Sequence, residues 1–267
     1  MTEKDHNILE INNVYASYSA SLRKLEYVLE DLSLAMKPGE CLGLVGKSGS
    51  GKTTLANLIT GFVRPVSGKI YFQGQEIQNL SFRQRIKQFN CGIQMVFQDP
   101  YSSFNPKMTI GKQLMEPLEI RKSFNRSEIE TKACHILEQV GLSADYFSRY
   151  PHQLSGGQLQ RVALGCALIV EPCLLIADEP VSSLDVSVQA QVLDLIVNLR
   201  KGFDFSCLFI SHDLAVVYHL CDTVAVLNRG SIVEQGNVEE VFQNPQNVYT
   251  KQLISDSGYD DLKRNQI

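Results

Sequence analysis

The stretch at residues 41–53 constrains the fold of this chain more than any other. Five apolar residues lead directly into a glycine-rich loop, and residues 52–59 then follow a helix-compatible pattern. The loop reads Gly46-Lys47-Ser48-Gly49-Ser50-Gly51-Lys52-Thr53. It matches G-x-x-x-x-G-K-[ST] between a strand and a helix, where backbone N–H groups and the helix N-terminus attract an anion. The sequence therefore predicts a phosphate-binding loop, with Lys52 as a point charge and Thr53 as a ligand of Mg²⁺.

A second apolar run, residues 173–177, ends in two acidic residues, Asp178 and Glu179. Because side chains alternate along a strand, we expect Asp178 to hold the Mg²⁺ shell. Glu179 lies just beyond the strand, where it can face the last phosphate and polarise an attacking water. Two acids after a strand often form only a solvated turn. The phosphate-binding loop in the same chain favours the catalytic interpretation.

A third motif, Leu154-Ser155-Gly156-Gly157-Gln158, begins a helix that is expected to end before Pro172. Two glycines at a helix start lower its stability, so we expect another group to approach them closely. The Ser155 hydroxyl and the free N–H groups of this N-terminus form a second anion site. Because one chain's phosphate loop already satisfies its own nucleotide, this second site is predicted to meet a phosphate held elsewhere.

Strands and helices alternate on both sides of a helical stretch at residues 109–160. The β-type runs are residues 8–14, 28–36, 41–45, 69–72, 173–177, 207–210 and 223–227. Within the helical stretch, Ser127 and Glu130 are predicted to form a capping box, and Gly141 to end the helix. A later helix has its core face at Val188, Val192, Leu195, Ile196 and Leu199, and Gly202 closes it. This alternation predicts an α/β fold with a mainly parallel sheet covered by helices.

Composition excludes several classes of protein. The 267 residues carry 25 Lys and Arg against 29 Asp and Glu, a net charge of −4, so charge alone does not predict binding to nucleic acid or anionic lipid. The seven cysteines show no disulfide or metal-ligand spacing, and we expect them to be reduced core residues of a cytosolic protein. No secretory signal is recognisable, and the longest uncharged apolar run, residues 162–170, is too short to span a bilayer.

The motifs together resemble those of ABC-type ATPase subunits, over nearly the whole chain. Gln98 stands at the position of the Q-loop glutamine, which in the family touches Mg²⁺ and the attacking water. Ser183-Leu184-Asp185 matches the D-loop, and His212 matches the switch histidine that contacts the γ-phosphate. Tyr18 is the best candidate for the aromatic residue that stacks on adenine. Extra residues around 19–26 blur this register, so Tyr15 and Tyr27 remain alternatives.

The resemblance implies a P-loop NTPase fold in a single domain, 1–267. Its catalytic core would comprise residues 1–99 and 166–254 with an N-terminal antiparallel β-subdomain, and residues 100–165 would form an inserted helical subdomain. We expect residues 255–267 to fray. The implied catalytic residues are Glu179, His212, Gln98 and Lys52, and the implied Mg²⁺ ligands are Thr53, Gln98 and Asp178. The implied ATP-binding residues are Tyr18, Gly46, Ser48, Gly49, Ser50, Gly51, Lys52, Thr53 and Thr54, with Ser155, Gly156, Gly157, Gln158 and Asp185 acting on the nucleotide of a second subunit.

Residues 95–106 and 242–253 more narrowly resemble ATPase subunits of importers for oligopeptides, dipeptides and nickel. Residues 148–153 lack the stretch typical of exporters, which favours import. The resemblance implies a peripheral subunit on the cytoplasmic face of the inner or plasma membrane. Its partners would be a second, homologous but non-identical ATPase subunit, two permease subunits and, indirectly, an extracytoplasmic solute-binding protein. The chain lacks the clustered C-terminal cysteines of some relatives, so we expect no iron–sulfur cluster.

Two alternatives belong to other functional classes. A P-loop kinase of a small metabolite would explain Lys52, Thr53 and Asp178, but it has no use for Ser155 or His212. A non-transport ABC ATPase acting in translation or DNA repair usually has two ATPase halves, a coiled coil or a zinc insertion, and none of these is recognisable here.

Overall fold

The structure, a computed structural model, describes residues 7–18, 26–89, 92–121 and 124–257. The chain divides into two compact units, the first made of residues 1–82 and 206–267 and the second of residues 83–205. The second unit is therefore an insertion between two pieces of the first.

The first unit contains β1 (Leu9–Ala16), β2 (Leu29–Met36), β3 (Cys41–Val45), α1 (Lys52–Thr60), β4 (Ser67–Phe72), β5 (Gln75–Glu76), β8 (Ser206–Ile210), α7 (Leu214–Leu220), β9 (Thr223–Asn228), β10 (Ser231–Asn237), α8 (Val238–Gln243) and α9 (Val248–Asp256). The second unit contains nearly all of α2 (Phe82–Phe89), then β6 (Ile93–Val96), α3 (Ile110–Arg121), α4 (Arg126–Gln139), α5 (Gly156–Leu168), β7 (Leu174–Asp178) and α6 (Val186–Gly202). Short 3₁₀ turns occupy Tyr101–Ser103, Ala144–Ser148 and Pro151–Gln153.

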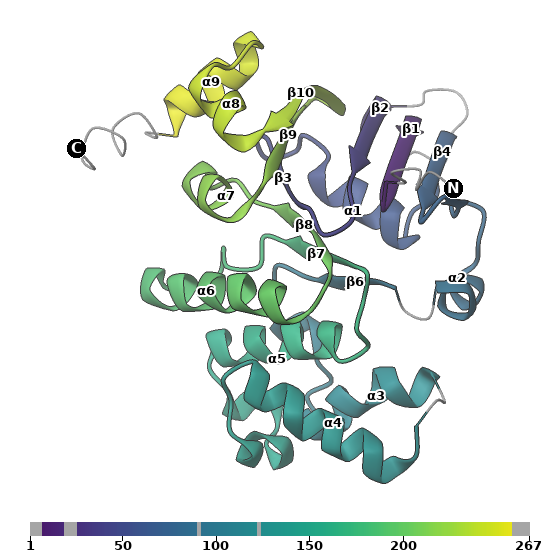
Figure 1. The fold of residues 1–267 in the computed structure, drawn as a ribbon, viewed down its shortest axis with the longest axis vertical. Coiled ribbons are helices and arrows are strands. Elements are labelled where there is room, and N and C mark those ends of the chain that lie inside the picture. Colours follow the sequence, from purple (N-terminus) through teal and green to yellow (C-terminus); the bar gives the residue numbers. More distant parts are fainter. Residues whose placement is uncertain (1–6, 19–25, 90–91, 122–123, 258–267) are drawn as a thin grey trace, which may run out of the picture. The chain divides into compact units, whose positions relative to one another are not determined.

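An antiparallel sheet with the order β2-β1-β4-β5 forms one layer of the first unit (Figure 1). In β1, Leu9, Ile11, Val14 and Ala16 are fully buried. Such alternating burial is typical of a strand that packs one face on a core. The expected antiparallel β-subdomain is present.

The strand that leads into the glycine-rich loop is central in its sheet. β3 lies between β8 and β9 and is parallel to both, while β10 pairs with β9 in the antiparallel direction. Leu44 is in register with Ile210 on one side and with Ala225 on the other. All five residues of β3 are buried, as expected for a parallel strand that is covered on both faces.

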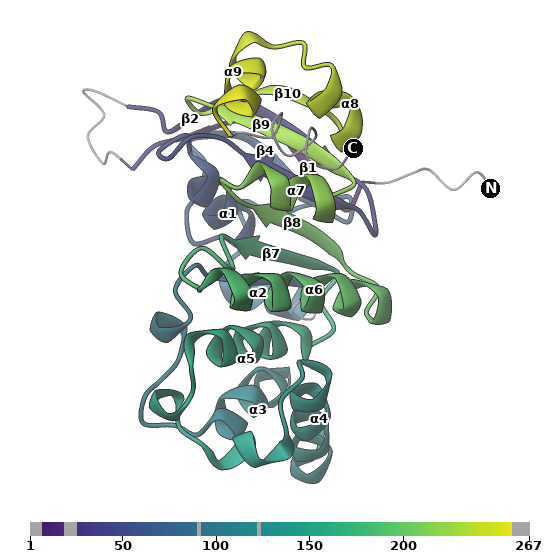
Figure 2. The same cartoon turned by 90° about the vertical axis from the view of Figure 1, so that its left-hand side faces the viewer.

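The second unit combines a pair of parallel strands with a group of helices. β6 pairs with β7 in parallel, with Val96 in register with Ala177. Helices α3, α4 and α5 pack against one another, and α6 packs against α5 (Figure 2). These features and those of the first unit confirm the predicted α/β class with parallel strands and covering helices.

The predicted capping box of α4 was wrong. The box is formed by Asn125 and Glu128: the Asn125 side chain accepts from the Glu128 N–H at 3.0 Å, and the Glu128 carboxylate accepts from the Asn125 N–H at 2.8 Å. Ser127 lies within the helix, where its carbonyl accepts from the Thr131 hydroxyl. Asn is as good an N-cap as Ser, so two overlapping patterns competed here.

Three further expectations concern cysteines, the C-terminus and membrane segments. Cys41, Cys207 and Cys221 are buried, the other described cysteines are half-buried, and Cys91 lies outside the described residues. Burial raises the pKa of the Cys166 thiol to about 12, with a smaller contribution from the Glu116 carboxylate. Helix α9 continues to Asp256, past Ser255, and residues 258–267 are outside the described part. None of the described helices has the length and apolar character needed to cross a membrane.

Candidate functional site

The glycine-rich loop has a backbone that other residues adopt only with strain. Gly51, the N-cap of α1, has φ +111°, and a Cβ there would lie 2.6 Å from a Leu29 methyl group. A Cβ on Gly46 would lie 2.2 Å from the carbonyl oxygen of Leu227. Gly49 has φ +76° but open space around it. Backbone conformation and packing together therefore require glycine at the two ends of the loop.

Lys52, the first residue of α1, folds back over this loop. Its ammonium donates to the Gly46 carbonyl oxygen at 2.9 Å and to the Lys47 carbonyl oxygen at 3.3 Å, although the residue is only 7% exposed. Thr53 follows with an exposed side chain. Ser50 is buried, and its hydroxyl makes no hydrogen bond with any residue of the described part of the chain. The end of the loop thus carries a buried charge on Lys52, an exposed hydroxyl on Thr53 and the positive end of the α1 dipole.

Tyr18, another predicted residue of the first unit, contacts the helix that follows this loop. The Tyr18 hydroxyl is 3.3 Å from Thr54 Oγ1, and the residue as a whole is 60% exposed. Tyr15 and Tyr27 instead pack edge to face on each other with ring centroids 5.3 Å apart. Of the three aromatic candidates, Tyr18 is therefore the one with a hydrogen bond to α1 and the most exposed.

His212 is exposed and lies two residues beyond Ile210, where β8 ends. Because β8 is parallel to β3, both strands end at the same edge of the sheet, where β3 enters the glycine-rich loop. The next residue, Asp213, caps α7 by accepting from the N–H groups of Ala215 and Val216. The fold thus brings His212 to the same edge as Gly46.

In the second unit, the structure joins Gln98 to Glu179, the second residue of the acidic pair. Asp178 ends β7 and is buried, and Glu179 is half-buried beyond it. Gln98 Nε2 donates to Glu179 Oε2 at 3.2 Å and to Ser182 Oγ at 3.1 Å. Glu179 has φ +46°, a left-handed conformation that is uncommon for a residue other than glycine and costs about 1–3 kcal/mol. Strain of this kind is concentrated at functional sites.

The D-loop segment also contacts the glutamine segment. The Ser183 hydroxyl donates to the carbonyl oxygen of Gln98 at 3.4 Å. Asp185 is the N-cap of α6, yet its exposed carboxylate makes no capping hydrogen bond. The structure therefore leaves this carboxylate at the surface of the second unit.

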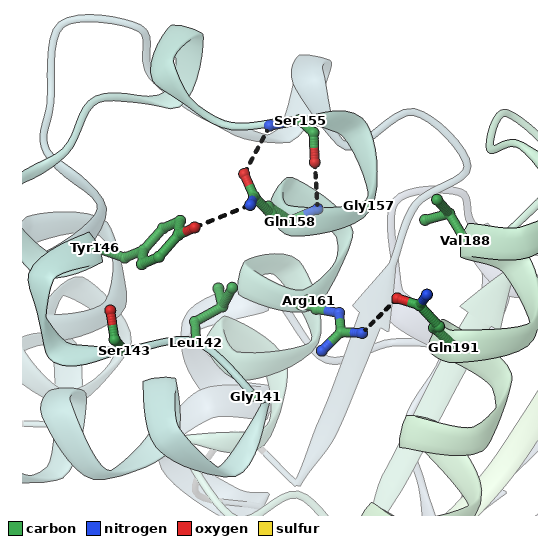
Figure 3. A pocket seen from close by; sticks show the side chains of 10 residues that line it. All are labelled: Gly141, Leu142, Ser143, Tyr146, Ser155, Gly157, Gln158, Arg161, Val188 and Gln191. Carbon is green, nitrogen blue, oxygen red and sulfur yellow. Dashed lines mark hydrogen bonds between the residues drawn. The ribbon is translucent and has the colours of Figure 1, made fainter.

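Ser155 caps α5 in a complete capping box. Its N–H donates to Gln158 Oε1 at 3.0 Å, and its hydroxyl accepts from the Gln158 N–H at 3.4 Å. Gln158 Nε2 in turn donates to the Tyr146 hydroxyl at 2.9 Å (Figure 3). The turn at Ser155 is therefore fixed by its own helix and by one tyrosine from the 3₁₀ turn Ala144–Ser148.

The second glycine of the motif is required by packing within this chain. A Cβ on Gly157 would lie 2.3 Å from Val188 Cγ1 of α6, whereas a Cβ on Gly156 would lie 3.3 Å from a Leu184 methyl group. A pocket of about 430 Å³ opens beside this turn, and Arg161 and Gln191 meet in its wall across 3.2 Å (Figure 3). The close approach expected at these glycines is thus partly made by α6.

The oxygen-bearing candidates fit a hard cation. Thr53 offers a hydroxyl, Gln98 an amide and Asp178 a carboxylate, and Mg²⁺ prefers such oxygen ligands with one or two carboxylates. Among the described residues there is no cluster of three or more His, Cys, Asp or Glu side chains suited to a metal. A site that is completed by phosphate and water does not need such a cluster.

Two residues at these sites carry no local sequence signal. Tyr146 contacts Gln158, and the Tyr249 hydroxyl accepts a hydrogen bond from the backbone N–H of Lys47 at 3.1 Å. Residues 242–253 stood out by resemblance, but nothing in their pattern assigns a role to Tyr249. Both side chains reach their motif through tertiary structure alone.

Comparison with known proteins identifies the family. Residues 29–182 match the family model described as "ABC transporter". The chain is 45% identical to the di/tripeptide transport ATP-binding protein DppF of Pseudomonas aeruginosa, over 85% of this chain and 70% of that protein. It is 43% identical to the dipeptide transport ATP-binding protein DppF of Escherichia coli, over 87% of this chain and 69% of that protein.

Solved structures with the same fold include two ATP-binding components. One is the ATP-binding cassette MJ0796, in a dimeric post-hydrolysis state bound to ADP and Pi, with a TM-score of 0.77, 26% identity and coverage of 86% of this chain and 98% of that chain. The other is cbiO1 of Clostridium perfringens, part of an ABC transporter complex, with a TM-score of 0.78, 28% identity and 95% coverage of both chains. The chain belongs to the ABC transporter family and is an ATPase of the ABC type.

Proposed function

We propose that this chain is the ATP-hydrolysing subunit of an ABC importer for dipeptides or short oligopeptides. The observation that carries the proposal is its similarity, over most of its length, to subunits named for di- and tripeptide transport. A small-metabolite kinase is excluded by family membership. The expected transport of nickel has no support among these relatives, so peptides are the proposed solute.

The proposed ATP site is assigned residue by residue from the motifs described above. Gly46, Ser48, Gly49, Ser50, Gly51, Lys52, Thr53 and Thr54 would surround the phosphates, and Tyr18 would stack on adenine. The buried Lys52 ammonium supports this role, because it already lies against loop carbonyl oxygens and needs little movement to reach a phosphate. Thr53, Gln98 and Asp178 would hold Mg²⁺, which when bound neutralises phosphate charge.

Hydrolysis would proceed by attack of a water oxygen on the γ-phosphorus, with ADP leaving. Glu179 would accept the proton of that water, and Gln98, hydrogen-bonded to Glu179, would orient both. Lys52 and His212 would stabilise the charge that develops on the transferred phosphoryl oxygens. The hydrogen bond that the Glu179 carboxylate accepts from Gln98 at 3.2 Å supports this assignment, because it joins the proposed base to the residue that would orient the water.

The turn at Ser155–Gln158, called the signature turn below, would act on a second subunit. Ser155, Gly156, Gly157, Gln158 and the exposed Asp185 would contact the ATP held by a homologous ATPase subunit, so that two nucleotides lie between two subunits. The partners would further include two permease subunits and an extracytoplasmic binding protein, which places this chain at the cytoplasmic face of the membrane as a peripheral subunit.

Reconstitution tests this proposal. The chain is co-expressed with its permease and ATPase partners, purified as a complex and placed in liposomes together with the binding protein. We expect ATP-dependent uptake of a radiolabelled dipeptide and no uptake with Lys52→Ala. Uptake of a nickel chelate instead of the dipeptide, or uptake that does not depend on Lys52, would contradict the proposal.

A further inference from the structure

Helix α9 lies against the glycine-rich loop of the first unit, and two of its side chains reach Lys47. The Tyr249 hydroxyl accepts a hydrogen bond from the Lys47 backbone N–H at 3.1 Å. The Asp256 carboxylate, almost two helical turns later, pairs with the Lys47 ammonium at 3.2 Å. Between loop and helix lies a pocket of about 360 Å³, lined in part by Ser48, Tyr249 and Gln252. Helix α9 therefore contacts the loop at Lys47, the residue that follows Gly46.

The Tyr249 hydrogen bond falls on a peptide group that also holds Lys52. The planar peptide unit between Gly46 and Lys47 contains the Gly46 carbonyl and the Lys47 N–H. The carbonyl oxygen accepts from the Lys52 ammonium at 2.9 Å, and the N–H donates to Tyr249 at 3.1 Å. Because a trans peptide directs these two groups to opposite sides, fixing the N–H also fixes the direction of the carbonyl oxygen.

Helix α9 is itself held firmly at its start. The Glu234 carboxylate of β10 accepts from the backbone N–H groups of Gln246 and Asn247, at 2.7 and 3.0 Å. The Asn247 side chain then caps the helix by accepting from the Tyr249 N–H at 2.8 Å. Tyr249 thus stands in the first turn of an anchored helix, where its hydroxyl has a defined place.

We propose that Tyr249 is a positioning residue for Lys52. It holds the Gly46–Lys47 peptide group in one orientation. In that orientation the Gly46 carbonyl oxygen accepts from the Lys52 ammonium and keeps it where a phosphate of ATP would bind. This inference rests on the proposed function only in taking the phosphates of ATP as the ligand of Lys52. The Lys47–Asp256 ion pair is about half exposed at both ends and adds little by itself.

Nucleotide binding to the purified full-length chain tests the proposal. Tyr249→Phe removes the hydroxyl and keeps the ring, and Gln252→Ala is the matched control, since Gln252 lines the same pocket from the same helix. We expect Tyr249→Phe to raise the Kd for MgATP about two- to tenfold, as for the loss of one hydrogen bond. Adenosine, which has no phosphate for Lys52, should bind wild type and variant equally. Gln252→Ala should match the wild type for both ligands.

A spectroscopic measurement separates positioning from a general loss of structure. In ¹⁵N–¹H spectra, the amide proton of Lys47 should shift upfield in Tyr249→Phe, while the thermal midpoint stays within error of the wild type. An unchanged Kd for MgATP, an unchanged Lys47 amide, or an equal loss of adenosine binding would overturn the proposal. A wild-type chain that binds no MgATP would instead overturn the proposed function, and this inference with it.

Discussion

The Gln98 side-chain amide donates a hydrogen bond to the Glu179 carboxylate across 3.2 Å, joining two residues that are 81 positions apart in the chain. The same amide reaches the Ser182 hydroxyl, so the glutamine spans the turn that follows β7. Glu179, which follows β7, has a left-handed backbone with φ +46°. In the proposed hydrolysis, the Gln98–Glu179 pair holds and orients the attacking water.

Replacing Glu179 by Gln should abolish ATP hydrolysis and leave ATP binding intact. An amide cannot accept the proton of water, so turnover should fall by at least about 10²-fold. The new Oε1 can still accept the hydrogen bond from Gln98. Phosphate release by the assembled transporter and ATP binding by the isolated chain are the measurements. Glu171→Gln is the matched control, since Glu171 is also a glutamate of the second unit with positive φ, and unchanged turnover in Glu179→Gln would refute the proposed role.

Replacing Tyr146 by Phe should weaken the signature turn without touching the phosphate loop. Gln158 Nε2 loses its acceptor, and the Gln158 oxygen that accepts from the Ser155 N–H becomes less well oriented. We expect ATP binding by the isolated chain to be unchanged and ATPase activity of the complex to fall about two- to tenfold. Tyr101→Phe, at an exposed tyrosine of the same unit, serves as the control. Weaker ATP binding by isolated Tyr146→Phe would contradict a role on the partner's nucleotide.

Replacing Gly157 by Ala should lower the free energy of unfolding by about 1–3 kcal/mol, because the new methyl group overlaps the Val188 side chain. Val188→Ala in the same chain should recover much of this loss. A double-mutant cycle in chemical denaturation should therefore give a coupling energy of about 1 kcal/mol or more. Additive effects would mean that α6 accommodates the methyl group without strain.

Replacing Glu234 by Gln should destabilise the chain only where the carboxylate is ionised. Burial acts to raise the pKa of Glu234, but hydrogen bonds from the N–H groups of Gln246 and Asn247, with the nearby Lys251 charge, lower it overall below its ordinary value of 4.5. A lowered pKa stabilises the fold above pH 4.5, and this contribution is lost as the pH falls through the folded-state pKa.

The free energy of unfolding of Glu234→Gln should therefore be lower than that of the wild type by about 1 kcal/mol at pH 7, because the group is partly exposed. The difference should close as the pH falls below 4.5. Denaturation series at pH 7 and at several values below 4.5 measure this. A gap that stays constant over this range would show that the charge of Glu234 does not contribute.

Local pattern predicted the strand, loop and helix around Lys52 well. The apolar run at 41–45 is β3 with the same bounds, and the helix predicted at 52–59 is α1, one residue longer. Here the turn chemistry and the periodicity point to the same structure. Strand β10 was missed, because its residues are half-buried or exposed and lack a clear alternation. The start of α4 was misplaced because Asn125 and Ser127 both fit an N-cap.

The candidate site was predictable as a set of motifs but not as a set of contacts. Spacing and resemblance identified Gln98 and Glu179 separately, yet their hydrogen bond depends on tertiary structure and on the positive φ of Glu179. The glycine at 157 was interpreted as room for an approaching phosphate, and the structure adds Val188 of the same chain as a reason for it. Tyr249 is 202 residues from Lys47, so no local pattern could relate them.

The position of β3 in its sheet has a consequence for biosynthesis. Cys41 pairs with Cys207, and Leu42 pairs with Thr223, so both neighbours of β3 are encoded after the entire inserted unit. At about 5–20 residues per second, the ribosome needs roughly 10–40 s to supply them once β3 has been made. During that interval β3 cannot pair with β8 or β9. It is an apolar strand that is buried on both faces in the native protein. We therefore expect the nascent chain to depend on chaperones until translation has passed residue 228, and truncations that end before β8 to aggregate.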